Sequence, residues 1–218
     1  MGTKLFIQQN KEWKELFWPF MSSVCLYFIS LYIELSKIFT DNFYLSNYYT
    51  DSKEQLLSLI ESERSNDWLN FVYVPIYVIL LAGVISILLY ILLVVLNRPQ
   101  KYLVCLKIGL LAQSVYAVNY FITVILKWLH FLSFDATNVN DVYTYQSLLA
   151  LTGYRKIPEW AWYFVAKGNI TELIFLIVLI LLIHYILNLT WMKSIFLSTL
   201  IQGIILLGGG LIYIYSLF

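Results

Sequence analysis

Apolar residues in this chain gather into long runs that are separated by polar stretches. The clearest run covers residues 68–97 without a single charge, and three more runs follow at 108–126, 173–192 and 194–218. A helix of about 20 apolar residues is enough to cross a hydrocarbon core about 30 Å thick. The pattern therefore predicts transmembrane helices.

A fifth run precedes these four and is interrupted only near its end, by Glu34 and Lys37. These two lie three positions apart on one helical face, where opposite charges can pair, and both are close enough to the boundary to reach the headgroups. We predict an all-α, polytopic integral membrane protein with one membrane domain over residues 1–218. Its five expected spans are 18–40, 69–96, 103–127, 172–191 and 194–217; an interfacial helix is the alternative for the first.

The polar stretches between the spans predict two long loops. Residues 41–68 are rich in Asn, Asp, Ser and Glu, with one weakly amphipathic stretch at 54–60 that predicts a short surface helix. Within the second loop, 128–171, the section 143–164 is rich in Leu, Trp and Tyr but is broken by Gly153 and Pro158. It is too short to span, so we expect a helix that lies in the interface or dips into the bilayer and returns.

Composition agrees with a membrane protein. Hydrophobic residues make up 61% of the chain and charged residues 12%, whereas soluble domains carry roughly 25% charged residues. The net charge of +1 is uninformative about partners, and the sequence shows no basic field of the kind that nucleic-acid binding requires. The lipid bilayer is therefore the first expected partner, and no direct nucleic-acid binding is expected.

Lysine and arginine predict the orientation, because they accumulate in cytoplasmic connections. Residues 1–17 contain three lysines, and the tight connection after the second span contains Arg98, Lys101 and Lys107 without an acid. The stretch 41–67 holds six acids against two bases. We expect the N-terminus in the cytoplasm and the C-terminus outside, in a bacterial inner membrane.

Ionisable groups inside a membrane are costly and are functional candidates by default. The strongest case is His184 in the fourth span, which could relay protons or bind a ligand if Gln113, Asn119 or Gln202 lies near it. The structural alternative is one interhelical hydrogen bond, worth about 1 kcal/mol. We favour the structural alternative.

The third span has a polar stripe formed by Gln113, Asn119 and Lys127, with Tyr116 and Tyr120 between them. Such a stripe could line a water-filled path through the membrane. It could equally hold neighbouring helices together through hydrogen bonds. Both interpretations stay open.

Small residues mark expected helix-packing positions. The second span contains the pair Ala82 and Ser86, and the fifth contains Gly203 and the triplet Gly208, Gly209 and Gly210. Small side chains let helix backbones approach closely. Three adjacent glycines also weaken a helix, so a hinge is the alternative to close packing, which we favour.

Recognisable catalytic chemistry is missing from the sequence. No Gly-x-Ser-x-Gly motif, phosphate-binding glycine loop or metal-ligand spacing occurs. An intramembrane enzyme would need His130, Asp135, Asp141 and His184 to converge on one cavity. We therefore expect no cofactor, no metal and no enzymatic activity.

The order of elements resembles the bacterial branch of the Yip-domain integral membrane family. The resemblance rests on the basic turn Leu-Asn-Arg-Pro-Gln-Lys at 96–101, the phrases Ile-Pro-Glu-Trp at 157–160 and Gly-Asn-Ile-Thr-Glu-Leu at 168–173, and the hairpin Asn-Leu-Thr-Trp-Met-Lys at 188–193. It implies five spans, a cytoplasmic N-terminus and a trafficking-type adaptor without a cofactor. Members of that family usually have small residues in the turn between the second and third spans. In this chain the turn contains Asn97, Arg98 and Pro99 instead.

The size and span number are also similar to those of small membrane proteins that accompany type VI CRISPR and other bacterial defence loci, some of which form oligomeric pores. Two functional hypotheses follow. The first is a non-enzymatic scaffold, adaptor or complex subunit that binds other membrane proteins or further copies of itself. The second is an oligomeric pore or channel lined by the polar stripe of the third span.

Overall fold

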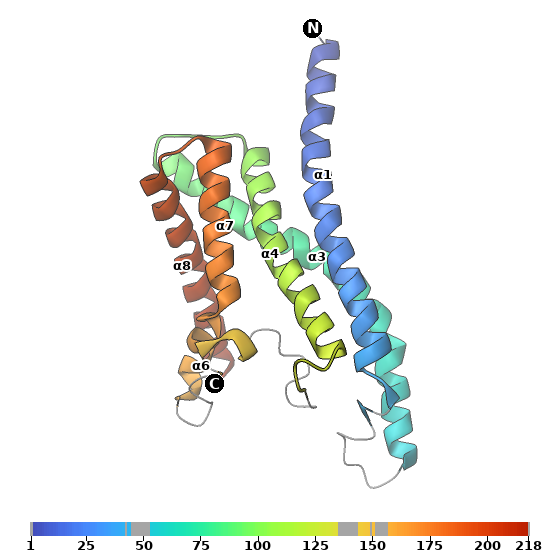
Figure 1. The fold of residues 1–218 in the computed structure, drawn as a ribbon. Coiled ribbons are helices and arrows are strands. Elements are labelled where there is room, and N and C mark those ends of the chain that lie inside the picture. The colour runs from blue at the N-terminus through green and yellow to red at the C-terminus, as the bar shows by residue number, and fades with distance from the viewer. Residues whose placement is uncertain are drawn as a thin grey trace.

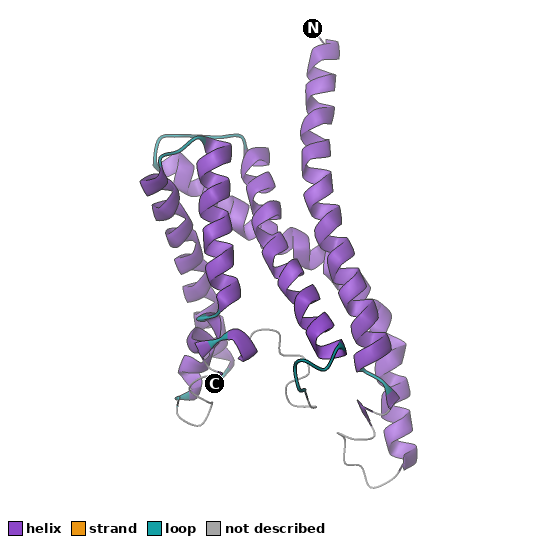
Figure 2. Ribbon diagram, viewed as in Figure 1, coloured by secondary structure: helices purple, strands orange, loops and turns teal. Residues whose placement is uncertain are grey.

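The computed structural model shows an all-α, polytopic membrane protein and describes residues 2–41, 43–44, 53–134, 144–148, 150 and 157–217 (Figure 1, Figure 2). Among these residues, five helices are long and apolar enough to cross a membrane. The elements in chain order are α1 (Gly2–Ile33), the π-helix η1 (Glu34–Ile38), α3 (Lys53–Val95), α4 (Tyr102–Trp128), the 3₁₀ helix η2 (Thr144–Gln146), α6 (Glu159–Lys167), α7 (Ile170–Leu187) and α8 (Trp191–Ser216).

Helix α4 is the central helix of the bundle. It packs against α1, α3 and α7, and 56% of its spanning stretch is buried, against 33% or less in the other four spans. Two apolar cores therefore meet on α4. One joins α3, α4, α7 and α8 through residues such as Ile85, Ile108, Phe175, Leu179 and Leu197; the other joins α1, α3 and α4 through Val24, Tyr27, Val78, Leu110 and Ala117.

Three features share one end of the bundle (Figure 1). They are the start of α1, the connection from α3 to α4 and the connection from α7 to α8. Each of the two connections begins with an asparagine in the left-handed conformation, Asn97 at φ 53° and Asn188 at φ 51°. Asparagine adopts this conformation more readily than most residues, so both helices stop there.

Several predicted boundaries differ from the structure. We predicted the first helix over 18–40, but α1 already begins at Gly2. We predicted a loop over 41–68 with a short helix at 54–60, but α3 runs unbroken from Lys53. Residues 53–74 contain neither glycine nor proline, so good helix formers extend the apolar helix into polar sequence. The fourth span was predicted to reach residue 191, whereas α7 ends at Leu187 because of the left-handed Asn188.

The small residues of the second span lie against a glycine of α4. Ala82 and Ser86 are fully buried, and a Cβ placed on Gly109 would collide with the Ser86 Oγ and the Ala82 carbonyl oxygen. Gly109 therefore permits the close approach of α3 and α4, and its part in this contact was missing from our sequence prediction.

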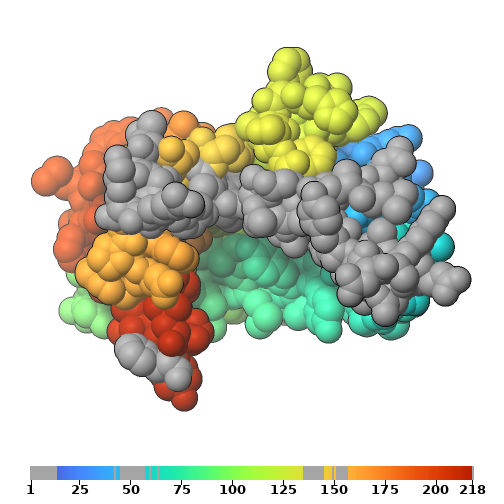
Figure 3. All heavy atoms as spheres, turned by 90° about the horizontal axis from the view of Figure 1, so that it is seen from below, coloured from blue at the N-terminus to red at the C-terminus, as the bar shows by residue number. Residues whose placement is uncertain are grey.

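The glycines of α8 divide into two kinds. A Cβ on Gly209 or Gly210 would collide with Tyr163 or Phe164 of α6, whereas Gly203 and Gly208 have nothing within 4 Å of that position. Helix α8 continues through all of them without a break. In the view from below, α6 lies beside the last part of α8 (Figure 3), so Gly209 and Gly210 provide the surface that α6 packs against.

Candidate functional site

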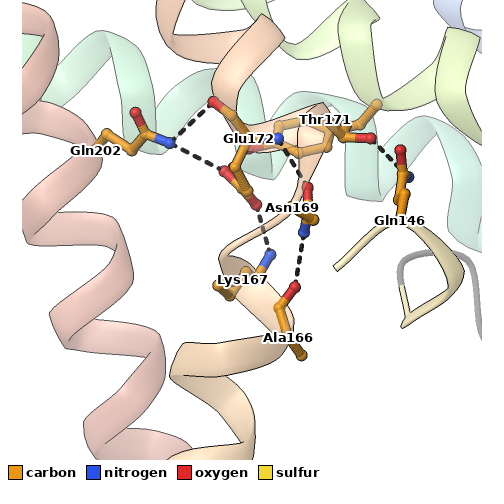
Figure 4. A network of polar contacts seen from close by, with 8 residues as sticks. Gln146, Ala166, Lys167, Asn169, Thr171, Glu172 and Gln202 are labelled. Atoms are coloured by element: carbon orange, nitrogen blue, oxygen red, sulfur yellow. Dashed lines mark hydrogen bonds and ion pairs between the residues drawn. The ribbon is translucent and has the colours of Figure 1, made fainter. Parts of the chain in front are cut away.

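A buried acidic residue, Glu172, lies at the point where α6 ends and α7 begins. The two helices are separated only by Gly168 and Asn169. The Asn169 side chain caps α7 by accepting a hydrogen bond of 2.8 Å from the Glu172 backbone N–H, and it donates one of 2.9 Å to the Ala166 carbonyl. Asn169 thus forms hydrogen bonds on both sides of the break between α6 and α7 (Figure 4).

Groups from three other helices bond the Glu172 carboxylate. Lys167 Nζ of α6 lies 2.9 Å from Oε1, and the Tyr116 hydroxyl of α4 donates to Oε2 at 2.9 Å. The Gln202 amide of α8 reaches both Oε2, at 3.3 Å, and the Glu172 carbonyl oxygen, at 3.1 Å. Glu172 therefore joins α4, α6, α7 and α8 at one point.

The segment 144–148 contacts α4 and the start of α7, beside the break between α6 and α7. Gln146 donates to Thr171 Oγ1 at 2.8 Å and to Asn119 Oδ1 at 2.9 Å. Ser147 pairs with Asn169 in an isolated β-bridge and is 4% exposed. Irregular backbone is tolerated at membrane depth only where protein or a polar cavity surrounds it, and these contacts supply that protein environment. We call the groups around Glu172 and Gln146 the Glu172 cluster.

A second buried acid lies in η1, which packs against α4. Glu34 is 6% exposed and accepts a hydrogen bond from the Tyr120 hydroxyl. Lys127, which is 4% exposed, attracts it electrostatically. The sequence suggested a pairing of Glu34 with Lys37, but Lys37 is exposed. In the π-helical turn at 34–38, Glu34 faces the bundle.

One face of α4 therefore serves both acids. Tyr116 and Tyr120 are four residues apart, so they lie one turn from each other on the same face. Tyr116 binds Glu172 and Tyr120 binds Glu34. A buried charge is tolerated when it is paired and hydrogen-bonded, and both carboxylates meet that condition.

The stripe residues of the third span are distributed among these contacts. Asn119 accepts from Gln146, and Lys127 lies near Glu34. Gln113 is fully buried, and neither its amide nitrogen nor its amide oxygen has a hydrogen-bond partner in the described part of the chain. The stripe faces the interior of a single protomer, and a role in lining a pore stays a prediction.

His184 lies at the other end of α7, apart from the Glu172 cluster. Its Nδ1 donates to the Leu189 carbonyl oxygen at 2.6 Å, and its ring stacks on Trp191 with centroids 4.0 Å apart. Of its three suggested polar partners, Gln202 belongs to the Glu172 cluster instead. His184 therefore fixes the turn between α7 and α8, and its hydrogen bond goes to that turn.

Sequence reasoning missed Glu172, Lys167 and Gln146 as members of a site. One local signal was present, because Asn169 and Glu172 have the Asn-x-x-Glu spacing of a capped helix start. Within the described residues, no group of three or more His, Cys, Asp or Glu side chains could hold a metal ion. Asp135 and Asp141, which the enzyme hypothesis requires, lie outside the described residues.

No family model, curated protein or solved structure matches this chain.

Proposed function

We propose that this chain is a non-enzymatic membrane scaffold, adaptor or complex subunit that acts through contacts with other membrane proteins and with lipid. The observation that carries this proposal is a groove of about 530 Å³ between α1, α3 and α4. Six of its seven lining residues are apolar, namely Leu16, Phe17 and Phe20 of α1, Ile79 of α3, and Leu106 and Leu110 of α4. Lys14 is the seventh.

A transmembrane helix of another protein is the occupant that fits this groove. Helix association in lipid depends on close van der Waals packing, and side chains beside an unfilled space lose those contacts. Phe17 and Ile79 are 54% and 56% exposed. The ion pair of Lys107 with Glu15, at 2.8 Å, joins α1 to α4 at this end.

The Glu172 cluster supports a role without chemistry. Both carboxylate oxygens of Glu172 are already bonded by groups of this chain. The polar atoms of the cluster therefore form hydrogen bonds that join four helices and the segment 144–148. A substrate would have to displace these bonds before it could reach the carboxylate.

Two further proposals concern the membrane location of the protein and its resemblance to the Yip family. We propose a bacterial inner membrane as its location, with the N-terminus in the cytoplasm. Arg98 and Lys101 belong to the connection from α3 to α4, and Lys193 belongs to the first turn of α8. That connection and the start of α8 lie at the same end of the bundle as the start of α1 (Figure 1), which supports the orientation. A trafficking-type adaptor of the Yip kind fits this arrangement.

Site-specific photocrosslinking in native membranes tests the scaffold proposal. A photoreactive residue is placed at Phe17 in the groove, or as a matched control at Ile212 on α8, which is 73% exposed and lies outside the groove. We expect a discrete protein adduct from position 17 and only lipid adducts from position 212. No protein adduct at position 17, or equal adducts at both positions, would overturn the proposal.

Reconstitution into liposomes tests the oligomeric pore. Gln113 and Lys127 are buried inside the protomer, so we expect the wild-type protein at high density to leave a trapped dye inside. Dye release by the wild type that falls in an Asn119→Ala variant would replace the scaffold with a pore.

A further inference from the structure

A small hollow lies where the end of α3 meets the start of α8. Its volume is about 210 Å³, and five of its seven lining residues are apolar: Leu93, Leu96, Leu189, Met192 and Phe196. The other two are Arg98 and Lys193. An apolar hollow whose described lining holds two bases and no acid favours an amphiphile with a negative charge.

Local backbone geometry fixes both bases at the hollow. The left-handed Asn97 ends α3 and is followed by a hydrogen bond of 2.9 Å from the Arg98 N–H to the Leu93 carbonyl. On the other side, His184 holds Leu189 and Trp191, which places Lys193 in the first turn of α8. The two connections that supply the bases are therefore both rigidly defined.

The charge of the hollow is uncompensated. Neither the Arg98 guanidinium nor the Lys193 ammonium group forms an ion pair or hydrogen bond with a residue that the structure describes. Thr190 at the start of α8 makes no side-chain capping bond, so the free N–H groups of the first turn add positive potential at the same place. An anion bound here would meet the two side chains and the helix start together.

The surroundings identify the source of that anion as lipid. Leu93 and Leu189, 1% and 5% exposed, are buried lining residues, whereas Met192 and Phe196 are 80% and 58% exposed. Exposed apolar side chains next to the two basic residues match the boundary between acyl chains and headgroups. Trp191 precedes Met192 in the chain and is 48% exposed, and tryptophans are enriched at membrane interfaces.

We infer that this hollow binds an anionic phospholipid. Its phosphate lies between Arg98 and Lys193, and its acyl chains run along Met192 and Phe196. This inference does not depend on the scaffold proposal, because it concerns a different surface from the groove beside α1.

Native mass spectrometry of the full chain in detergent tests the site with phosphatidylglycerol and phosphatidylcholine as probes. We expect the wild type to retain phosphatidylglycerol preferentially, and the variant Arg98→Gln/Lys193→Gln to lose roughly tenfold in affinity for each base that contacts the phosphate. The control Lys101→Gln removes a charge from the same end, outside the described lining of the hollow, and should retain the lipid. Equal losses in both variants would overturn the site.

A second measurement needs no variant. Phosphatidylglycerol, but not phosphatidylcholine, should protect Lys193 of the wild type from an amine-reactive reagent, whereas Lys101 stays reactive. Inorganic phosphate distinguishes the two possible sources of the anion. Equal protection by phosphate alone, or no protection by phosphatidylglycerol, would overturn the lipid assignment.

Discussion

Replacing Glu172 with glutamine is expected to loosen the contacts among α4, α6, α7 and α8. The substitution keeps the shape of the side chain but removes the charge that Lys167 approaches at 2.9 Å. It also replaces one carboxylate oxygen with an NH2 group, either the oxygen that accepts from Lys167 or the oxygen that accepts from Tyr116 and Gln202. At least one of these donors then loses its acceptor.

The magnitude follows from how deeply each partner is buried. Removing one member of a fully buried ion pair costs about 3–5 kcal/mol. The Glu172 side chain is 10% exposed, but that of Lys167 is 31% exposed and can turn its ammonium group toward polar headgroups. We therefore expect a loss of about 1–3 kcal/mol in the free energy of unfolding, measured by denaturing-detergent titration.

A local readout separates this effect from general instability. Ser147 is 4% exposed and pairs with Asn169, so a cysteine at position 147 should react slowly with a maleimide in the wild-type background and faster in Glu172→Gln. The matched control is Glu15→Gln, which breaks the exposed pair with Lys107 and should cost below about 1 kcal/mol.

A second substitution provides the strictest check. In the Glu172→Gln background, Lys167→Met removes the charge that has lost its partner and should recover part of the lost stability. Unchanged stability and unchanged cysteine protection in Glu172→Gln would refute the role of the Glu172 cluster in holding the segment 144–148.

Three further predictions use single substitutions and the same detergent titration. Gly109→Ala should destabilise, because its Cβ meets Ser86 and backbone, whereas Gly203→Ala has open space and should be neutral or stabilising by up to about 1 kcal/mol; equal effects would refute the close α3–α4 contact. Asn169→Ala removes the cap of α7 and should cost about 1 kcal/mol, with no loss counting against the cap. His184→Ala removes the bond to the turn and the stack on Trp191 and should cost about 1–2 kcal/mol. If the variant has the same free energy of unfolding as the wild type, the turn forms without His184.

The spanning helices could be predicted because the bilayer imposes their length and composition. Residues 103–127 were predicted for the third span, and α4 covers Tyr102–Trp128. The polar extension of α3 back to Lys53 was not predicted, because hydropathy reports where a helix is apolar rather than where it ends. The turn at Asn188 depends on one left-handed residue, which an apolar window does not detect.

The Glu172 cluster could not be predicted because its members are far apart in the chain. Tyr116 and Gln202 reach Glu172 from 56 and 30 residues away, and Gln146 reaches Asn119 from a loop. Each side chain alone has an ordinary explanation, such as an aromatic residue in a span. Only the packing of α4, α7 and α8 brings them together.

Polar contacts have a particular weight in a bundle of this kind. Lipid is as apolar as leucine, so apolar faces alone do not select which helices associate. Specific selection must come from close backbone contacts, such as Gly109 against Ala82, and from buried hydrogen bonds. Tyr120 binds Glu34 in one half of the bundle and Tyr116 binds Glu172 in the other. Helix α4 therefore specifies both halves, and the surfaces left for partners are those that these two tyrosines do not face.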